Sequence, residues 1–177
     1  MSQLKVNSII PAGGLPSGSN GGIIQTVHVN SNTHMSSTAT SYTDLTGVTA
    51  TITPQSNSNK ILIVCGLAIS KEANHSFLGR VVRNGSAISG SGGVRESGNS
   101  SQENGTWWLI RTTNHDVHPA VIHYLDSPGT TSATTYKAQG KTSNSSYGFA
   151  LNRTKAGSNQ LYASPAFSYM TLFEISA

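Results

Sequence analysis

VTATITPQSNSNKILIVCGLAIS, residues 48–70, contains two different strand patterns on either side of a polar turn. Its first part alternates apolar residues with threonine up to Pro54, which is typical of a strand with one face on a core and the other toward water. Residues 60–70 are almost all apolar, which predicts a strand buried on both faces. Cys65 lies inside this run and is expected to pack as a small core hydrophobe.

Similar patterns recur along the chain at short intervals. Asn84-Gly85 lies between two β-like runs and is a strong hairpin signal, because both turn positions need positive φ. No helical periodicity stands out. We therefore expect roughly nine or ten strands in an all-β, antiparallel β-sandwich with jelly-roll topology. Besides a strand that starts at residue 23, the expected strands are 48–53, 60–70, 76–83, 86–88, 106–113, 119–126, 132–139, 146–152 and 167–175.

The last expected strand has bulky residues on both faces. Such a strand lies in the middle of a sheet or against another subunit, because an exposed apolar edge promotes aggregation. Glu174, between Phe173 and Ile175, is expected either to face a subunit contact or to make a buried hydrogen bond. The candidate subunit-interface residues are Tyr169, Phe173, Glu174 and Ile175.

The chain divides at a glycine-rich link. Residues 11–22 contain five glycines and two prolines, so they suit neither a helix nor a central strand. We expect residues 1–22 to form an extended N-terminal arm with this link, and residues 23–177 to form the sandwich knob. The apolar start of the arm has no covering layer of its own, so it is expected to dock on another surface. The candidate docking residues are Leu4, Val6, Ile9, Ile10 and Pro11.

Composition excludes several classes of protein. The 177 residues suffice for one domain, and only 10% are charged, against a usual value of about 25%. The net charge of +4 comes from scattered Lys and Arg, so no nucleic-acid partner is expected. No apolar run approaches the ~20 residues of a membrane span, so membrane insertion is not expected either.

The sequence contains no catalytic motif. It lacks a Gly-x-Ser-x-Gly elbow and a phosphate-binding loop, so we expect neither an enzyme nor a bound cofactor. His115, Asp116, His118 and His123 form the richest polar cluster, but in a loop that runs into a strand they point in different directions. Solvated or capping histidines are therefore expected rather than a metal site, although a threefold axis that gathers one histidine from each subunit stays open.

Trp107 and Trp108 are adjacent, so in a strand they point to opposite faces. One is expected in the core. The other is a candidate ligand platform, suited to stacking on a sugar, or an intersubunit contact.

Several segments resemble one family. The opening LKVNSIIPAGGLPSGSNGGIIQTV (4–27) is similar to the start of small β-structured virion proteins of tailed bacteriophages, often phages of cyanobacteria. The similarity continues in YTDLTGVTATITPQSNSNKILIVCGLAIS (42–70), GRVVRNGSAI (79–88), YLDSPGTTSATTYKAQG (124–140) and MTLFEISA (170–177). The resemblance implies a homotrimeric β-sandwich knob on the virion, assembled in the host cytoplasm, with no catalytic motif to carry over.

Two roles fit this resemblance. In the first, the chain is a capsid decoration (cement) protein that grips a phage capsid protein through its arm and stabilises the head. In the second, it is a tail-fibre or receptor-binding tip that attaches to a host surface glycan or protein, next to other tail proteins. The chain shows an arm and one knob but no shaft repeat, which favours decoration.

Overall fold

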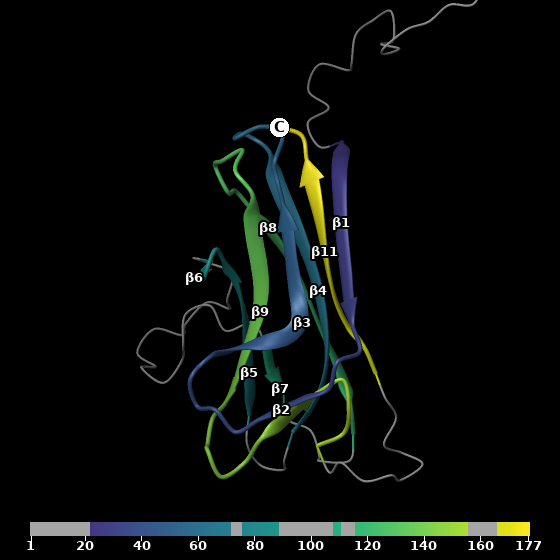
Figure 1. Ribbon diagram of the computed structural model, residues 1–177, viewed down its shortest axis with the longest axis vertical. Helices are drawn as coiled ribbons and strands as arrows, with labels where there is room; N and C mark the ends of the chain where they lie inside the picture. Colours follow the sequence, from purple (N-terminus) through teal and green to yellow (C-terminus); the bar gives the residue numbers. More distant parts are fainter. Residues whose placement is uncertain (1–21, 72–75, 89–107, 111–115, 156–165) are drawn as a thin grey trace, which may run out of the picture.

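The computed structural model of the protein describes residues 22–71, 76–88, 108–110, 116–155 and 166–177 (Figure 1). Within these ranges all regular structure is β-strand, which confirms the all-β prediction. The strands are β1 (Ile23–Ser31), β2 (Met35–Ser37), β3 (Thr43–Ile52), β4 (Lys60–Lys71), β5 (Phe77–Arg83), β6 (Ser86–Ala87), β7 (Trp108–Ile110), β8 (His118–Asp126), β9 (Thr134–Thr142), β10 (Phe149–Leu151) and β11 (Ser168–Ile175).

The strands form two antiparallel sheets that pack in two layers (Figure 1). In the first sheet, β4 pairs with β8 along one edge, and β11 and β10 each pair with it as well. β1 pairs with β11, and β2 pairs with β10. In the second sheet the order is β3-β9-β5, and both β6 and β7 pair with β5. The predicted antiparallel sandwich is therefore confirmed.

The core lies between the two sheets. Alternate residues of each strand point inward, as in β9, where every second residue from Thr134 to Thr142 is buried. Phe77 of the second sheet meets Phe149 of the first edge to face, with ring centroids 4.9 Å apart. The large side chains with almost no exposed surface are Leu45, Ile52, Ile61, Ile63, Leu67, Ile69, Phe77, Tyr136, Phe149, Leu151, Met170 and Leu172.

A buried polar contact joins the sheets at one side of this core. Arg83 of β5 donates from Nη1 to both carboxylate oxygens of Asp126 at the end of β8, at 2.9 and 2.8 Å. Tyr136 of β9 donates its hydroxyl to the same carboxylate at 2.7 Å. Burial, followed by the neighbouring carboxylate, raises the pKa of the Tyr136 phenol well above its ordinary range.

Three local predictions are confirmed. The apolar run 60–70 is β4, and its residues 65–71 are buried whichever face they point to. Asn84 and Gly85 both have positive φ, 48° and 84°, and form the tight turn between β5 and β6. The last strand, β11, is central, with β1 on one side and β4 on the other.

The structure also contains strand that the sequence pattern did not indicate. β3 begins at Thr43 rather than at 48. Its pairing with β9 covers residues on both sides of a register shift between Asp44 and Thr49. Leu45 and Val48 both reach the core across this bulge, which breaks the alternation. Gly47 sits in the bulge with φ of 78°, a conformation that glycine adopts without strain. β2, only three residues long, was not expected either.

Candidate functional site

The outward side of the first sheet is the candidate functional site. Register between β1, β11, β4 and β8 places their outward residues in three rows across the sheet. We call these twelve residues the outer face. The rows are Thr26, Phe173, Leu62 and Leu125; His28, Thr171, Val64 and His123; and Asn30, Tyr169, Gly66 and Val121.

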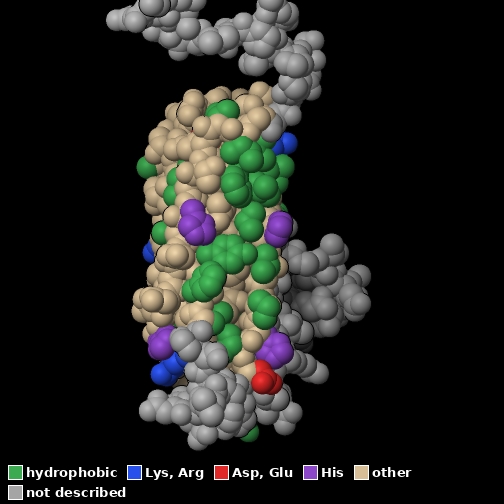
Figure 2. Space-filling view, turned by 90° about the vertical axis from the view of Figure 1, so that its right-hand side faces the viewer, with side chains coloured by type: hydrophobic (Ala, Val, Ile, Leu, Met, Phe, Trp, Pro, Cys, Tyr) green, Lys and Arg blue, Asp and Glu red, His purple; other side chains and the backbone are tan. Residues whose placement is uncertain are grey.

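The outer face contains no lysine, arginine, aspartate or glutamate. Val121 and Leu125 are 48% and 45% exposed, and Phe173, Leu62 and Val64 are half-buried. Figure 2 shows hydrophobic side chains gathered in a band along this side of the molecule, with histidines beside the band and charged side chains only at its margins. An exposed apolar surface of this kind is typical of a protein–protein contact.

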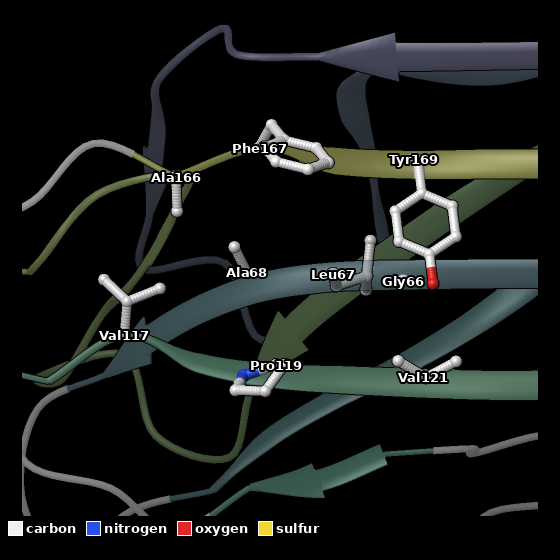
Figure 3. A pocket seen from close by; sticks show the side chains of 9 residues that line it. All are labelled: Gly66, Leu67, Ala68, Val117, Pro119, Val121, Ala166, Phe167 and Tyr169. Carbon is white, nitrogen blue, oxygen red and sulfur yellow. The ribbon is translucent and has the colours of Figure 1, made fainter.

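A groove of about 440 Å³ hollows one end of this side. Few side-chain atoms fill its floor, because the outward residues of β4 there are the small Gly66 and Ala68. Phe167 and Tyr169 form one wall, and Pro119 and Val121 of β8 form the other (Figure 3).

Tyr169 defines the shape of this groove. Its ring lies over Gly66, so that a Cβ added at residue 66 would collide with the ring. In Figure 3 the Tyr169 side chain reaches from β11 across β4. Phe167, just before β11, is 64% exposed and is the most exposed large hydrophobic residue of the described chain. The groove can therefore take apolar groups, and its aromatic rings offer faces for stacking.

Two histidines occupy the ends of the middle row. His28 lies on β1 and His123 on β8, the two edge strands, with Thr171 and Val64 between them. The His28 Nδ1 and the Thr171 hydroxyl oxygen are 2.8 Å apart and share a hydrogen bond. His123 and Val121 share the outward face of β8.

Three of the four candidate interface residues point outward, namely Tyr169, Phe173 and Ile175. Glu174 does not, and its assignment to a subunit contact is corrected here. It is fully buried, and its Oε1 accepts hydrogen bonds from the Gln55 N–H and the Asn59 Nδ2, each at 2.6 Å. The alternative reading, a buried hydrogen bond, is the one that the structure supports.

The other site predictions fall largely outside the described residues. The docking residues Leu4, Val6, Ile9, Ile10 and Pro11 lie there, as does Trp107. Trp108 begins β7, opposite Gly79 of β5. The docking arm and the ligand platform therefore stay predictions.

Within the described ranges, no three His, Cys, Asp or Glu side chains converge as metal ligands, and His115 lies outside these ranges. His118 begins β8 opposite Ile69, on the other parity from His123. Cys65 is a buried free cysteine, as expected, and burial raises the pKa of its thiol far above the usual range. A helix able to span a membrane is not found among the described residues.

The outward side of the second sheet has a different chemistry. Lys137 Nζ and Gln139 Nε2 donate to the two carboxylate oxygens of Asp44, at 2.8 and 2.7 Å. These bonds hold the pKa of the Asp44 carboxyl below its ordinary value. Arg80 donates from Nε to Gln139 and lies 4.0 Å from the centroid of the Tyr42 ring. The polar groups on this side form hydrogen bonds with one another and remain accessible to water.

Sequence reasoning missed most of the outer face. Leu62, Val64, Val121 and Leu125 join the β11 residues only through register between strands that are distant in sequence. The sequence signal for these residues was that 60–70 is apolar at odd and at even positions, so that both faces of the strand are apolar. Comparison of the chain with models of known protein families finds no match, and comparison with curated protein sequences finds no significant match.

Proposed function

We propose that this chain is a structural protein of a tailed-bacteriophage virion, a homotrimeric knob that acts as capsid decoration (cement) and stabilises the head. The observation that carries the proposal is the outer face. It offers an apolar surface without charged side chains, on a protein whose net charge is +4. Copies of this protein can meet there without like-charge repulsion.

The outer face is the centre of the proposed contact between copies and not the whole of it. Its twelve residues cover four strands about 4.8 Å apart and about five residues along each strand, roughly 300 Å² in projection. A specific interface buries about 1,200–2,000 Å² in total, so in a threefold assembly residues around the outer face add to the contact. Threefold symmetry is taken from the resemblance to phage virion proteins, and closed symmetry hides the same surface on every copy.

The strand order supports the jelly-roll topology that the sequence favours. The wide part of the first sheet has the order β1-β11-β4-β8, and the second has β3-β9-β5-β7. Successive long strands pass from one sheet to the other, as in the two Greek keys of a jelly roll. We infer this topology, which many virion proteins share.

Docking on the particle is assigned to residues 1–22, whose apolar start is suited to strand addition or groove binding on a capsid protein. To test it, the full chain and a variant lacking residues 1–11 are compared. We expect both to be folded trimers by sedimentation equilibrium, with only the full chain present in purified particles. A copy number of many tens to hundreds per particle supports decoration. A monomeric full chain, or a deletion variant that is unfolded, contradicts the proposal.

The groove favours a second candidate function, a tail-fibre or receptor-binding tip. Its aromatic wall and open shape suit contact with a host surface glycan or an apolar protein segment. Ala68→Leu places a larger side chain in the groove floor and tests this role. If the purified protein binds host cells and blocks infection, and the variant loses both activities while remaining a trimer, the receptor-binding role is supported. A copy number of a few per particle points the same way.

A further inference from the structure

We propose, resting on the receptor-binding function given as the second candidate, that Asn152 is the positioning residue of the groove. It fixes Phe167 in the wall and Ala68 in the floor, in a shape that binds an uncharged, apolar segment of a host surface protein. Asn152 follows β10 and is fully buried. Its φ of 61° lies in the left-handed region, which a residue other than glycine keeps only where its surroundings enforce it.

The Asn152 side chain ties the groove to the end of β1. Its Nδ2 donates to the carbonyl oxygens of Ser31 and Thr33, at 2.9 and 3.0 Å. The Nδ2 group therefore has an acceptor for each of its two hydrogens, which compensates for its burial. The Asn152 backbone N–H donates to the Ala68 carbonyl at 2.9 Å, next to the pairing of β10 with β4.

The same residue holds the chain on both sides of Phe167. The Asn152 carbonyl accepts the Ala166 N–H at 3.1 Å, and its Oδ1 accepts the Ser168 hydroxyl at 2.6 Å. The Ser168 hydroxyl oxygen in turn accepts the Ala68 N–H at 3.0 Å. Wall and floor are thus bonded to each other through buried groups that meet at Asn152.

Phe167 combines a large exposed ring with a fixed backbone. Its ring lies between Ala166 and Tyr169 in the groove wall (Figure 3) and is 64% exposed, so it contributes little to the core. A contact residue that is already held in place loses less conformational freedom on binding, which raises affinity. Phe167 is therefore the contact residue, and Asn152 acts through it.

The lining of the groove distinguishes between the two kinds of ligand. Its volume of about 440 Å³ is within the range of about 300–1,000 Å³ that is typical of ligand sites. Among the nine described residues that line it, none is charged, and Tyr169 alone has a polar side-chain group. A glycan brings many hydroxyl groups, whose burial is unfavourable without hydrogen-bond partners. In charge and polarity the lining is complementary to an uncharged, apolar protein segment.

The experiment compares Asn152→Gly with Asn59→Gly. Glycine adopts a positive φ without strain, so Asn152→Gly keeps the backbone conformation and removes three side-chain hydrogen bonds. Asn59 is the matched control, because it is also buried and also bonded through both ends of its amide, to Glu174 and to the Ala177 N–H. It precedes the start of β4, away from the groove residues 66–68.

Two measurements are made on the unsubstituted chain and on each variant, with the folded fraction determined by urea titration. The first is the affinity of the purified protein for host cells. The cells are used untreated, after protease treatment, which removes surface protein, and after periodate treatment, which oxidises glycans. The second is hydrogen exchange, followed by mass spectrometry, of the peptide that contains residues 166–170.

We expect Asn152→Gly to lower the affinity for host cells at least ~10-fold, because a released Phe167 and its backbone must be ordered again on binding. Hydrogen exchange at 166–170 should become at least ~10-fold faster. Asn59→Gly should change both quantities less than about threefold, because it is distant from the groove. Phe167→Ala should lower the affinity at least ~30-fold without changing the exchange. Protease treatment of the cells should abolish binding, and periodate should not.

The outcomes separate the proposal from the function on which it rests. If Asn152→Gly keeps the affinity or the exchange of the unsubstituted chain, the positioning role is overturned and the receptor-binding function stands. If Asn152→Gly does not fold, Ser168→Ala, which removes only the hydroxyl bonded to Oδ1, is held to the same two criteria. Binding that periodate abolishes and protease does not overturns the protein segment in favour of a glycan. An unsubstituted chain that binds no host cells overturns the receptor-binding function itself.

Discussion

The two outward sides of the sandwich are built from the same kind of strand but treat charge in opposite ways. On the second sheet, Asp44, Lys137, Gln139 and Arg80 form a bonded network that water can also reach. On the first sheet, the outer face has none of these residue types and exposes valine and leucine instead. A sheet face in contact with water tolerates isolated charges. A face that is covered by protein excludes them, since a charge without a partner loses its solvation on burial.

The largest expected effect comes from placing the same charge on each side. Thr171 and Thr51 are matched, because each has a side-chain hydrogen bond of 2.8 Å on its own sheet. At neutral to alkaline pH, Thr171→Asp should weaken self-association at least ~100-fold, because an unpaired buried charge is unfavourable by about 3–5 kcal/mol. Thr51→Asp should change it less than about threefold. Equal effects of the two variants in sedimentation equilibrium would remove the distinction between the sides.

The next effect concerns the carboxylate beneath the outer face. Glu174→Leu removes the acceptor of one buried and one partly buried hydrogen bond and should lower the free energy of unfolding by about 2–3 kcal/mol in urea titration. Self-association of the folded fraction should persist. If this variant keeps its stability but no longer associates, Glu174 belongs to the contact between copies after all.

A smaller effect is expected at the buried tyrosine that joins the sheets. Tyr136→Phe removes a hydrogen bond to the Asp126 carboxylate and should lower the free energy of unfolding by about 1.5–3 kcal/mol, toward the lower end because the pair keeps Arg83.

This tyrosine also predicts a dependence on alkaline pH. Its folded pKa is raised above the ordinary value of 10.0, so its contribution is complete below that value and declines as the pH rises above it. Urea midpoints measured on both sides of this value should converge for the unsubstituted chain and Tyr136→Phe at high pH. A constant difference between the two proteins would refute this assignment.

The smallest effect belongs to the polar network of the second sheet. Asp44→Asn should change the free energy of unfolding by no more than about 0.5 kcal/mol, because the Lys137–Asp44 ion pair is solvent-exposed. The pKa of Asp44 is lowered from 3.8, so its small contribution is present above that value and is lost as the pH falls below it. A loss of several kcal/mol in thermal unfolding would show that this network is structural.

The fold was readable where the sequence shows regular alternation, a continuous apolar run or a turn dipeptide. The runs at 60–70, 76–83 and 119–126 became β4, β5 and β8, and Asn84-Gly85 became the turn. β3 was truncated in the prediction because the bulge at Gly47 moves two apolar residues onto one face with a spacing that alternation does not allow.

The candidate site was only partly readable. The apolar residues of β11 can be recognised locally, but their neighbours come from β4 and β8, more than forty residues away along the chain. A shift of one residue in the β4–β8 pairing would turn His123 and Val121 inward, and the same shift in the β11–β4 pairing would turn Tyr169 and Phe173 inward. Register between distant strands therefore decides the content of the outer face, and one sequence does not specify it.

The hydrogen bond from the Ser176 N–H to the Gly22 carbonyl, 3.0 Å long, places the start of β1 beside the end of β11. A peptide tag or reporter fused after Ala177 would thus emerge close to Gly22, where the chain enters β1. The exposed turn at Asn84-Gly85 lies on the second sheet, on the other layer from the outer face. Insertions for labelling or epitope display are better placed in that turn than at either terminus.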